Sequence, residues 1–365
     1  MKPVTGWVYW RGQEAKYPSW QFGQLEADPK GGLKFTAEAD RPGEHPRQWI
    51  IPGLVDAHNH LQIGGDGPVS EEVALDRAIQ ELSSGVLALR DLGNPHESPA
   101  HHLARAPRLV TAGRHLARPK RYLPGLALEV EDQADLPAAV AQQVQAGNPW
   151  VKLVGDWIDR SRGSEADLDP LWDRAVLIDA VQTAHELGAR VAVHVFGRSA
   201  LDDLFEAGVD SIEHGTGMTW EHCQEAAARG ITVTPTLGQV ELFPQFAGAA
   251  TRYPNYAQTM INLYQNWRTW WANLVEARVQ LLPGSDAGGY QPHGQLFREL
   301  YRWEGAGLDA TTIIDYATWQ ARDFLGFDSL STGAPADFLV LRDDPMVELT
   351  VLGEPLRIVF DGQDV

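Results

Sequence analysis

From about residue 53 to residue 330, short apolar runs alternate with longer stretches whose apolar positions recur every three or four residues. The short runs are typical of buried strands and the longer stretches of amphipathic helices. The expected strands lie at 53–58, 85–91, 107–113, 150–156, 189–195, 208–214, 230–236 and 279–286, and the expected helices include 71–85, 136–147, 171–188, 199–208 and 221–230. This alternation predicts an α/β fold, a (β/α)8 TIM barrel. A doubly wound open sheet is the alternative, and the lack of a glycine-rich phosphate loop after the first run disfavours it.

The two ends of the chain have a different pattern, with short apolar segments separated by glycine, proline and charged residues. These segments lie at 6–10, 19–27, 32–39 and 48–52, and again at 336–345 and 356–362. Such spacing predicts strands joined by turns. We therefore expect residues 1–52 and 331–365 to form one small β-sandwich domain beside a barrel domain spanning 53–330.

The first expected barrel strand ends in the sequence Asp-Ala-His-Asn-His. Side chains two residues apart on a strand point to the same side, so His58 and His60 project together. Two imidazoles side by side supply half of a typical zinc site. Catalytic residues of TIM barrels lie where the strands end, which makes this pair a candidate metal site.

Lys152 lies in the middle of the fourth apolar run. An unpaired ammonium buried there is costly, so the side chain needs a carboxylate partner such as Asp156 or Asp91, or a chemical modification. Three further polar residues stand at strand ends: His194 on the fifth strand, His214 on the sixth and Asp286 on the eighth. Each alone fits a hydrogen-bonded core residue, but their joint placement at one end of a barrel favours a shared site.

Taken together, these motifs resemble the amidohydrolase superfamily of metal-dependent hydrolases, in the branch with a binuclear metal centre. The resemblance is strongest to imidazolonepropionase-related and Xaa-Pro or Xaa-Arg dipeptidase-like enzymes. It covers nearly the whole chain through the segments IIPGLVDAHNHL (50–61), GVLALRDLG (85–93), WVKLVGD (150–156), VAVHVFGRSALDDLFEAGVDSIEHGT (191–216), LLPGSDAGGYQPHGQLFREL (281–300) and GAPADFLVLRDDP (333–345).

The resemblance implies two divalent metal ions, with zinc favoured by the imidazole and carboxylate ligands. In the family pattern the first ion is bound by His58, His60 and Asp286, the second by His194 and His214, and Lys152 bridges both as a carbamate formed with CO2. The resemblance also implies that a hydroxide between the ions attacks the substrate. Asp286 then moves the proton to the leaving nitrogen.

This resemblance predicts a hydrolase that cleaves an amide C–N bond in a small molecule, such as a dipeptide or an N-acyl amino acid. A cyclic-amide, lactone or ester hydrolase, or a deaminase, on the same barrel is the alternative. Ring deaminases of the superfamily commonly carry His-x-x-Glu on strand five and lack the lysine on strand four, whereas this chain has His194-Val-Phe-Gly and keeps Lys152. A non-catalytic binding protein is disfavoured because all the ligand positions are present.

The segment 112–130, which follows the third strand, is strongly basic and departs from the glycine- and histidine-rich segment of the relatives. It holds an anionic substrate group or balances acidic neighbours. Phe196 stands where dipeptidase-like relatives often have tyrosine, which argues against a strict dipeptidase. The candidate substrate contacts are His115, Tyr122, Arg198, Tyr290 and His293.

The net charge of −19 would repel phosphate groups, so neither a nucleic-acid partner nor an anionic membrane is expected. No run approaches about 18 apolar residues, and no apolar run of signal-peptide length precedes Arg11. Cys223 is the only cysteine, which excludes a disulfide within one chain. These features predict a cytoplasmic protein and leave self-association into a homo-oligomer open.

Overall fold

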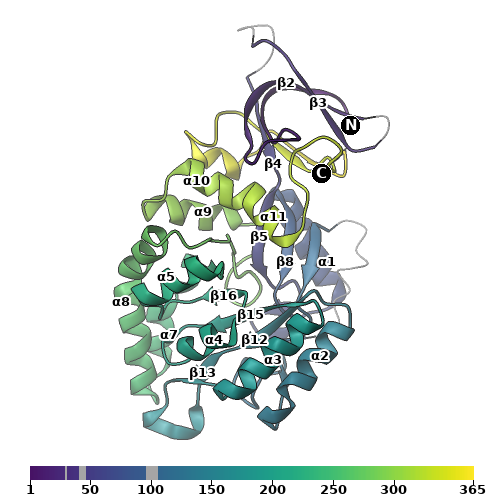
Figure 1. Cartoon of the computed structure of the whole chain (residues 1–365). Coiled ribbons are helices and arrows are strands. Elements are labelled where there is room, and N and C mark those ends of the chain that lie inside the picture. Colours follow the sequence, from purple (N-terminus) through teal and green to yellow (C-terminus); the bar gives the residue numbers. More distant parts are fainter. Residues whose placement is uncertain (29–30, 41–46, 96–105) are drawn as a thin grey trace.

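The strands of the central region form a closed ring in the computed structural model, which describes residues 1–28, 31–40, 47–95 and 106–365 (Figure 1). Neighbouring strands of the ring pair in parallel. In order they are β5 (Leu54–Asn59), β8 (Val86–Asp91), β9 (Arg108–Thr111) continued by β10 (Leu116–Ala117), β12 (Trp150–Val154), β15 (Arg190–Val195), β16 (Ser211–His214), β17 (Thr232–Thr234) and the segment 279–287.

The segment 279–287 closes the ring with isolated bridges instead of a continuous ladder. Its bridges join Leu281 to Val233 of β17 and Ala287 to Asn59 of β5. Between them, the N–H of Ala57 donates to the carbonyl of Pro283 at 2.8 Å. The proline has no N–H of its own, which interrupts a regular ladder at this point. The ring is complete despite this irregularity, and the predicted (β/α)8 barrel is confirmed.

Helices surround the ring on its outer side (Figure 1). They are α1 (Glu71–Ser83), α2 (Leu136–Gln145), α3 (Arg174–Glu186), α4 (Leu201–Ala207), α5 (Trp220–Arg229), α6 (Leu237–Val240), α7 (Phe243–Ala249), α8 (Pro254–Glu276), α9 (Leu296–Gly305), α10 (Ala310–Asp315) and α11 (Ala321–Leu325). Gly208 and Gly230 end α4 and α5 in the left-handed conformation that glycine adopts without steric cost. None of the helices described has the length and apolar content needed to cross a membrane.

Both chain ends contribute to a separate seven-stranded sheet with the order β20-β19-β18-β4-β1-β2-β3. Its strands are β1 (Val4–Trp10), β2 (Ser19–Ala27), β3 (Leu33–Ala37), β4 (Trp49–Pro52), β18 (Phe338–Leu341), β19 (Arg357–Phe360) and β20 (Gln363–Asp364). β4 pairs with β1 on one side and with β18 on the other, so it joins the two terminal segments. Val8, Leu25, Ile50 and Phe338 form its buried core.

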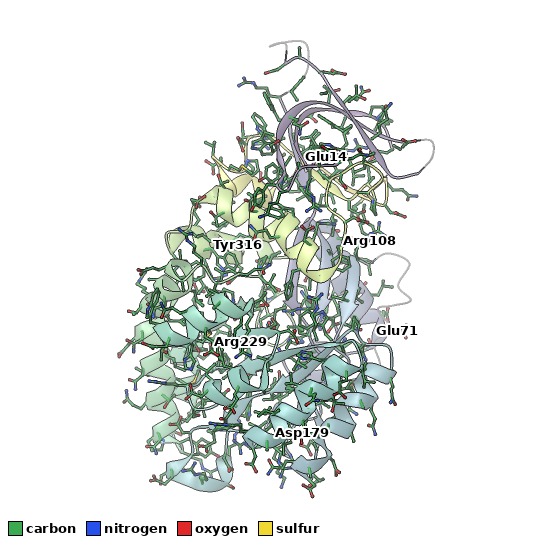
Figure 2. The ribbon with its side chains drawn as sticks, in the orientation of Figure 1. Glu14, Glu71, Arg108, Asp179, Arg229 and Tyr316 are labelled. Carbon is green, nitrogen blue, oxygen red and sulfur yellow. The ribbon has the colours of Figure 1, made fainter. Side chains whose placement is uncertain are left out.

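The terminal sheet is tied to the barrel by charged side chains. Arg108 of β9 donates to Asp337 at 2.8 Å and to Asp361 at 3.1 Å, and Figure 2 shows Arg108 where the two parts meet. Arg322 of α11, which is 2% exposed, donates to the carbonyls of Gly53 and Asp328. These contacts hold β4 and β5 in a fixed relation, so the terminal sheet braces the first barrel strand.

Candidate metal centre

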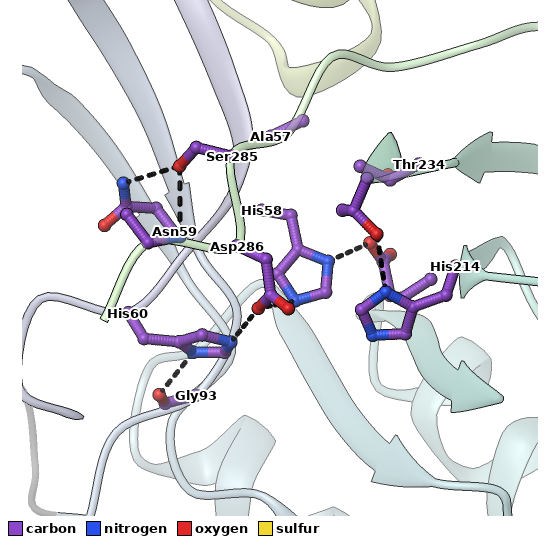
Figure 3. A network of polar contacts seen from close by, with 12 residues as sticks. Ala57, His58, Asn59, His60, Gly93, His214, Thr234, Ser285 and Asp286 are labelled. Carbon is purple, nitrogen blue, oxygen red and sulfur yellow. Dashed lines mark hydrogen bonds and ion pairs between the residues drawn. The ribbon is translucent and has the colours of Figure 1, made fainter. Parts of the chain in front are cut away.

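His58 and His60 lie at the carboxyl end of β5, beside Asp286 (Figure 3). The Nε2 atoms of the two histidines are 3.2 and 3.4 Å from the same Asp286 oxygen. His60 Nδ1 is 3.0 Å from the carbonyl of Gly93, which only accepts, so this nitrogen carries the proton. His60 Nε2 is then an acceptor facing a carboxylate, an arrangement that a cation between the two atoms stabilises.

His194 and His214 come from the neighbouring strands β15 and β16, and their ring centroids are 4.7 Å apart. The Thr236 hydroxyl donates to a backbone carbonyl, so it accepts from His214 Nδ1 at 2.7 Å and leaves His214 Nε2 without a proton. His194 Nε2 is buried without a hydrogen-bond partner in the described structure. Burial lowers the pKa of His214 to about 3 and that of His194 well below its ordinary value. Both rings are therefore neutral, the form that binds metals.

Lys152 lies at the centre of β12 and is 1% exposed. Its Nζ has no hydrogen-bond partner among the described residues. Burial lowers the pKa of Lys152 to about 8, although the carboxylates of Glu213 and Asp286 favour the charged form. Asp156 and Asp91, the partners considered from the sequence, bind elsewhere: Asp156 accepts from two backbone N–H groups after β15, and Asp91 accepts from Asn94 and the N–H of Gly93. Lys152 is therefore a buried amine directed at the histidine cluster.

A buried ion pair below the cluster was not anticipated from the sequence. Arg90 of β8 donates to Glu213 Oε1 at 2.9 Å, and Glu213 Oε2 lies 2.9 Å from His58 Nδ1. Burial alone raises the pKa of Glu213, but Arg90 and Lys152 hold that pKa well below its ordinary value. The sequence feature that could have revealed this pair is the one that identified Lys152. Arg90 and Glu213 are also charged residues within apolar strands.

Asp56 connects β5 to the closing segment of the barrel. Its Oδ1 accepts from the N–H groups of His58 and Ser285 at 3.1 and 3.0 Å, and its Oδ2 accepts from the side chain of Asn59. Burial, followed by the charge of Glu81, raises the pKa of Asp56 to about 7. This carboxyl group holds the two strand ends that carry His58 and Asp286.

The cluster opens into a cavity of about 310 Å3 on the carboxyl side of the barrel. The ligand atoms of His58, His214 and Asp286 that face one another all lie within 4.8 Å. The cavity is otherwise rich in aromatic rings, contributed by Tyr122, Trp157, Phe196, Phe246, Tyr253, Tyr256 and Tyr290. This arrangement suits divalent metal ions at the base and an organic substrate above them.

The five candidate substrate residues lie in different places. Tyr122 and Tyr290 line the cavity. His115 is fully buried, and its Nε2 lies 3.3 Å from the Tyr122 hydroxyl. Arg198 lines a separate cavity, and His293 is 2.9 Å from Glu81. Neither Arg198 nor His293 is among the described residues that line the cavity above the histidine cluster.

Three arginines of the basic segment 112–130 donate hydrogen bonds to backbone carbonyls. Arg114 donates to the carbonyl of Ala127, and Arg118 donates to the carbonyls of Val130 and Glu131. Arg121 donates to the carbonyls of residues 157 and 169 in the β13 (Asp156–Ile158) and β14 (Leu168–Pro170) hairpin. These three guanidinium groups therefore shape the wall of the cavity and do not line it.

Comparison with known proteins identifies the family. Residues 49–365 match the model of the Amidohydrolase family, and the chain belongs to this family. An uncharacterized protein of Mycobacterium tuberculosis (strain ATCC 25618 / H37Rv) is 44% identical over 342 residues, which cover 93% of this chain and 90% of that protein. The predicted membership of the amidohydrolase superfamily is confirmed.

Solved structures share the fold at low sequence identity. A Xaa-Pro dipeptidase with bound methionine in its active site has a TM-score of 0.77 at 20% identity, with 99% of this chain and all of that chain covered. A putative prolidase from Bifidobacterium longum has a TM-score of 0.80 at 20% identity, with 100% and 94% covered. The family, together with this shared fold, supports a hydrolase.

Proposed function

We propose that this protein is a binuclear metal-dependent hydrolase that cleaves the amide C–N bond of a dipeptide or an N-acyl amino acid. The observation that carries the proposal is the convergence of five side chains with metal-binding atoms at the carboxyl ends of the barrel strands. His58, His60 and Asp286 would hold one ion, and His194 and His214 the other. Two observations support bound cations at these positions. Acceptor atoms of His60 and Asp286 face each other, and His194 Nε2 is buried without a hydrogen-bond partner among the described residues.

Lys152 completes the proposed centre as a carbamate. Its neutral amine would add CO2, forming an N–C bond and releasing one proton. The product would be an anion in place of a cation, and its two oxygens would add to a ligand set in which Asp286 is otherwise the one oxygen donor among the five proposed residues. The buried and unpartnered Nζ supports this step, because an ammonium in the same place has no hydrogen-bond partner among the described residues.

Two bound divalent ions would supply an ionised water near neutral pH and polarise the scissile carbonyl. Asp286 would move the proton. Its side chain is 14% exposed and lines the cavity, which supports this role. It would accept a proton from the water and return it to the amine product.

The choice of amide is supported by the fold neighbours, which include a Xaa-Pro dipeptidase and a putative prolidase. Phe196 argues against a strict dipeptidase, because it lines the cavity with a ring that has no hydroxyl for a substrate peptide group. The proposed substrates therefore include N-acyl amino acids as well as dipeptides.

Metal analysis of protein purified without chelator tests the proposal, together with Lys152→Ala, Lys152→Glu and the exposed control Lys2→Ala. We expect about two ions per chain in the wild type and the control, a clear loss in Lys152→Ala, and partial retention in Lys152→Glu, which restores a carboxylate. One ion per chain in every variant would contradict the bridging lysine. The same samples are then assayed for hydrolysis of dipeptides, N-acyl amino acids and lactones, and metal-loaded protein inactive on all the amides would contradict the proposed reaction.

A further inference from the structure

Aromatic rings extend outward from the metal centre in two rows. The first row begins at His194 and continues to Trp157, with a centroid distance of 5.4 Å, and then to Tyr122 at 4.9 Å. Trp157 lies on the β13 hairpin and Tyr122 in the segment after β10. Both rings line the cavity. The rings are tilted against one another, with interplanar angles of 55° and 60°, so this side of the cavity is an aromatic, largely apolar wall.

The second row begins at His214 and is built by α7 and the loop after the closing barrel segment. Phe196 lies 4.7 Å from the His214 ring and 4.9 Å from Phe243, which supports Phe246 from behind. Phe246 contacts Tyr290 at 5.2 Å, and Tyr290 is 55% exposed. The row thus leads from the buried centre to solvent.

Arg160 is the only lysine or arginine among the residues that line this cavity. It begins the 3-10 helix η3 (Arg160–Glu165) and is exposed. Two acidic side chains of the same hairpin are engaged by other cations, since Asp159 pairs with Arg121 and Asp169 pairs with Arg162. The Arg160 guanidinium therefore presents an available positive charge to the cavity in a chain whose net charge is −19.

We propose that the site takes an amide that carries both an aromatic group and a free carboxylate, with the ring held against the two aromatic rows and the carboxylate paired with Arg160. Flat rings pack well on aromatic walls, and guanidinium groups bind carboxylates through paired N–H donors. The inference rests on the proposed function for the amide, but the ring and carboxylate contacts need no metal ion.

Binding of small acids to metal-free protein tests these contacts separately from the reaction. The probes are 3-phenylpropionate, its neutral analogue 3-phenylpropanamide, and propionate, which lacks the ring. Dissociation constants are measured by ligand-observed NMR. We expect the phenyl acid to bind about fivefold more tightly than the amide, as for a partly exposed ion pair. The phenyl acid should also bind at least about tenfold more tightly than propionate, because binding buries its ring.

Two variants assign the contacts to residues, each with a matched control. Arg160→Gln should abolish the preference for acid over amide, whereas Arg162→Gln, on the same turn but paired with Asp169, should keep it. Tyr290→Ala should weaken both phenyl ligands, whereas Tyr264→Ala, an exposed tyrosine on α8, should not. Equal binding of acid and amide by the wild type, or an unchanged preference in Arg160→Gln, would overturn the inference. Failure of the proposed function would appear instead in the metal content and hydrolysis assays.

Discussion

The buried Arg90–Glu213 pair allows a sharp test of what holds the interior of the barrel together. Both side chains are fully buried, and Arg90 also donates to the carbonyl of Ala57 at 2.7 Å and to Ser211 and Thr234 at 3.2 and 3.3 Å. Replacing Arg90 by leucine removes the cation that hydrogen-bonds the buried Glu213 carboxylate and leaves only the more weakly interacting Lys152 near it. Breaking a buried pair in this way costs about 3–5 kcal/mol, because the remaining charge loses its hydrogen-bonded partner.

The size of the effect on thermal unfolding follows from the length of the chain. An unfolding entropy of about 2.1 cal/mol/K per residue corresponds to about 0.8 kcal/mol/K for 365 residues. Arg90→Leu should therefore lower the Tm by about 4–7 °C. Circular dichroism melts of chelator-treated proteins measure it, so that any change in metal content does not contribute.

Two further variants control this experiment. Arg90→Leu combined with Glu213→Leu removes both charges and should recover most of the loss, because apolar residues of similar volume replace buried ion pairs at little cost. Arg174→Leu removes a surface arginine, 55% exposed, that pairs with Asp203, and should lower Tm by about 1 °C or less. A Tm of Arg90→Leu within 1 °C of the wild-type Tm would refute the reasoning. A double variant whose Tm is no higher than that of Arg90→Leu would also refute it.

Two other predictions concern a buried carboxyl group and a glycine. Burial raises the pKa of Asp156 to about 7, so between its unfolded pKa and pH 7 the folded protein binds a proton that the unfolded chain has lost. The free energy of unfolding of the wild type should therefore fall relative to Asp156→Asn as the pH rises from 5 to 8, and urea midpoints that keep a constant difference would contradict this. Gly288 has φ +137°, and a Cβ there would lie 2.7 Å from the carbonyl oxygen of His60, whereas nothing lies within 4 Å of a Cβ at Gly289. Gly288→Ala should cost about 1–3 kcal/mol of stability and Gly289→Ala much less, and equal melting temperatures for the two variants would show that the loop adjusts freely.

Several features of this protein could be predicted from local sequence pattern. The barrel strands end near His58, His194 and His214 as expected, because short apolar runs bounded by polar residues are a property of the chain itself. The expected helices 199–208 and 221–230 end at the glycines that the structure places in the left-handed conformation. The unusual charge of Lys152 within an apolar strand was also visible, although the lack of a hydrogen-bond partner for it among the described residues was not.

The longer helical region after β17 was harder to predict. The helices named from the sequence end at residue 230, yet α6, α7 and α8 together occupy most of 237–276 and supply Phe246 and Tyr256 to the cavity. The inward-facing apolar residues of α8 do recur every three or four residues, at Met260, Leu263, Trp267, Trp270, Trp271 and Leu274, whereas α6 and α7 are too short to show such a stripe.

The sequence by itself determined the order of strands and helices, the family, and the residue types available at each strand end, because these depend on neighbours along the chain. Only the tertiary structure decided which charges meet. It paired Arg90 with Glu213 and left Lys152 without a hydrogen-bond partner among the described residues. It also directed three arginines of 112–130 to backbone carbonyls and placed Arg160 in the lining of the cavity. Side-chain direction and long-range contact depend on how the strands twist and close into a ring, and that closure joins residues more than 200 positions apart.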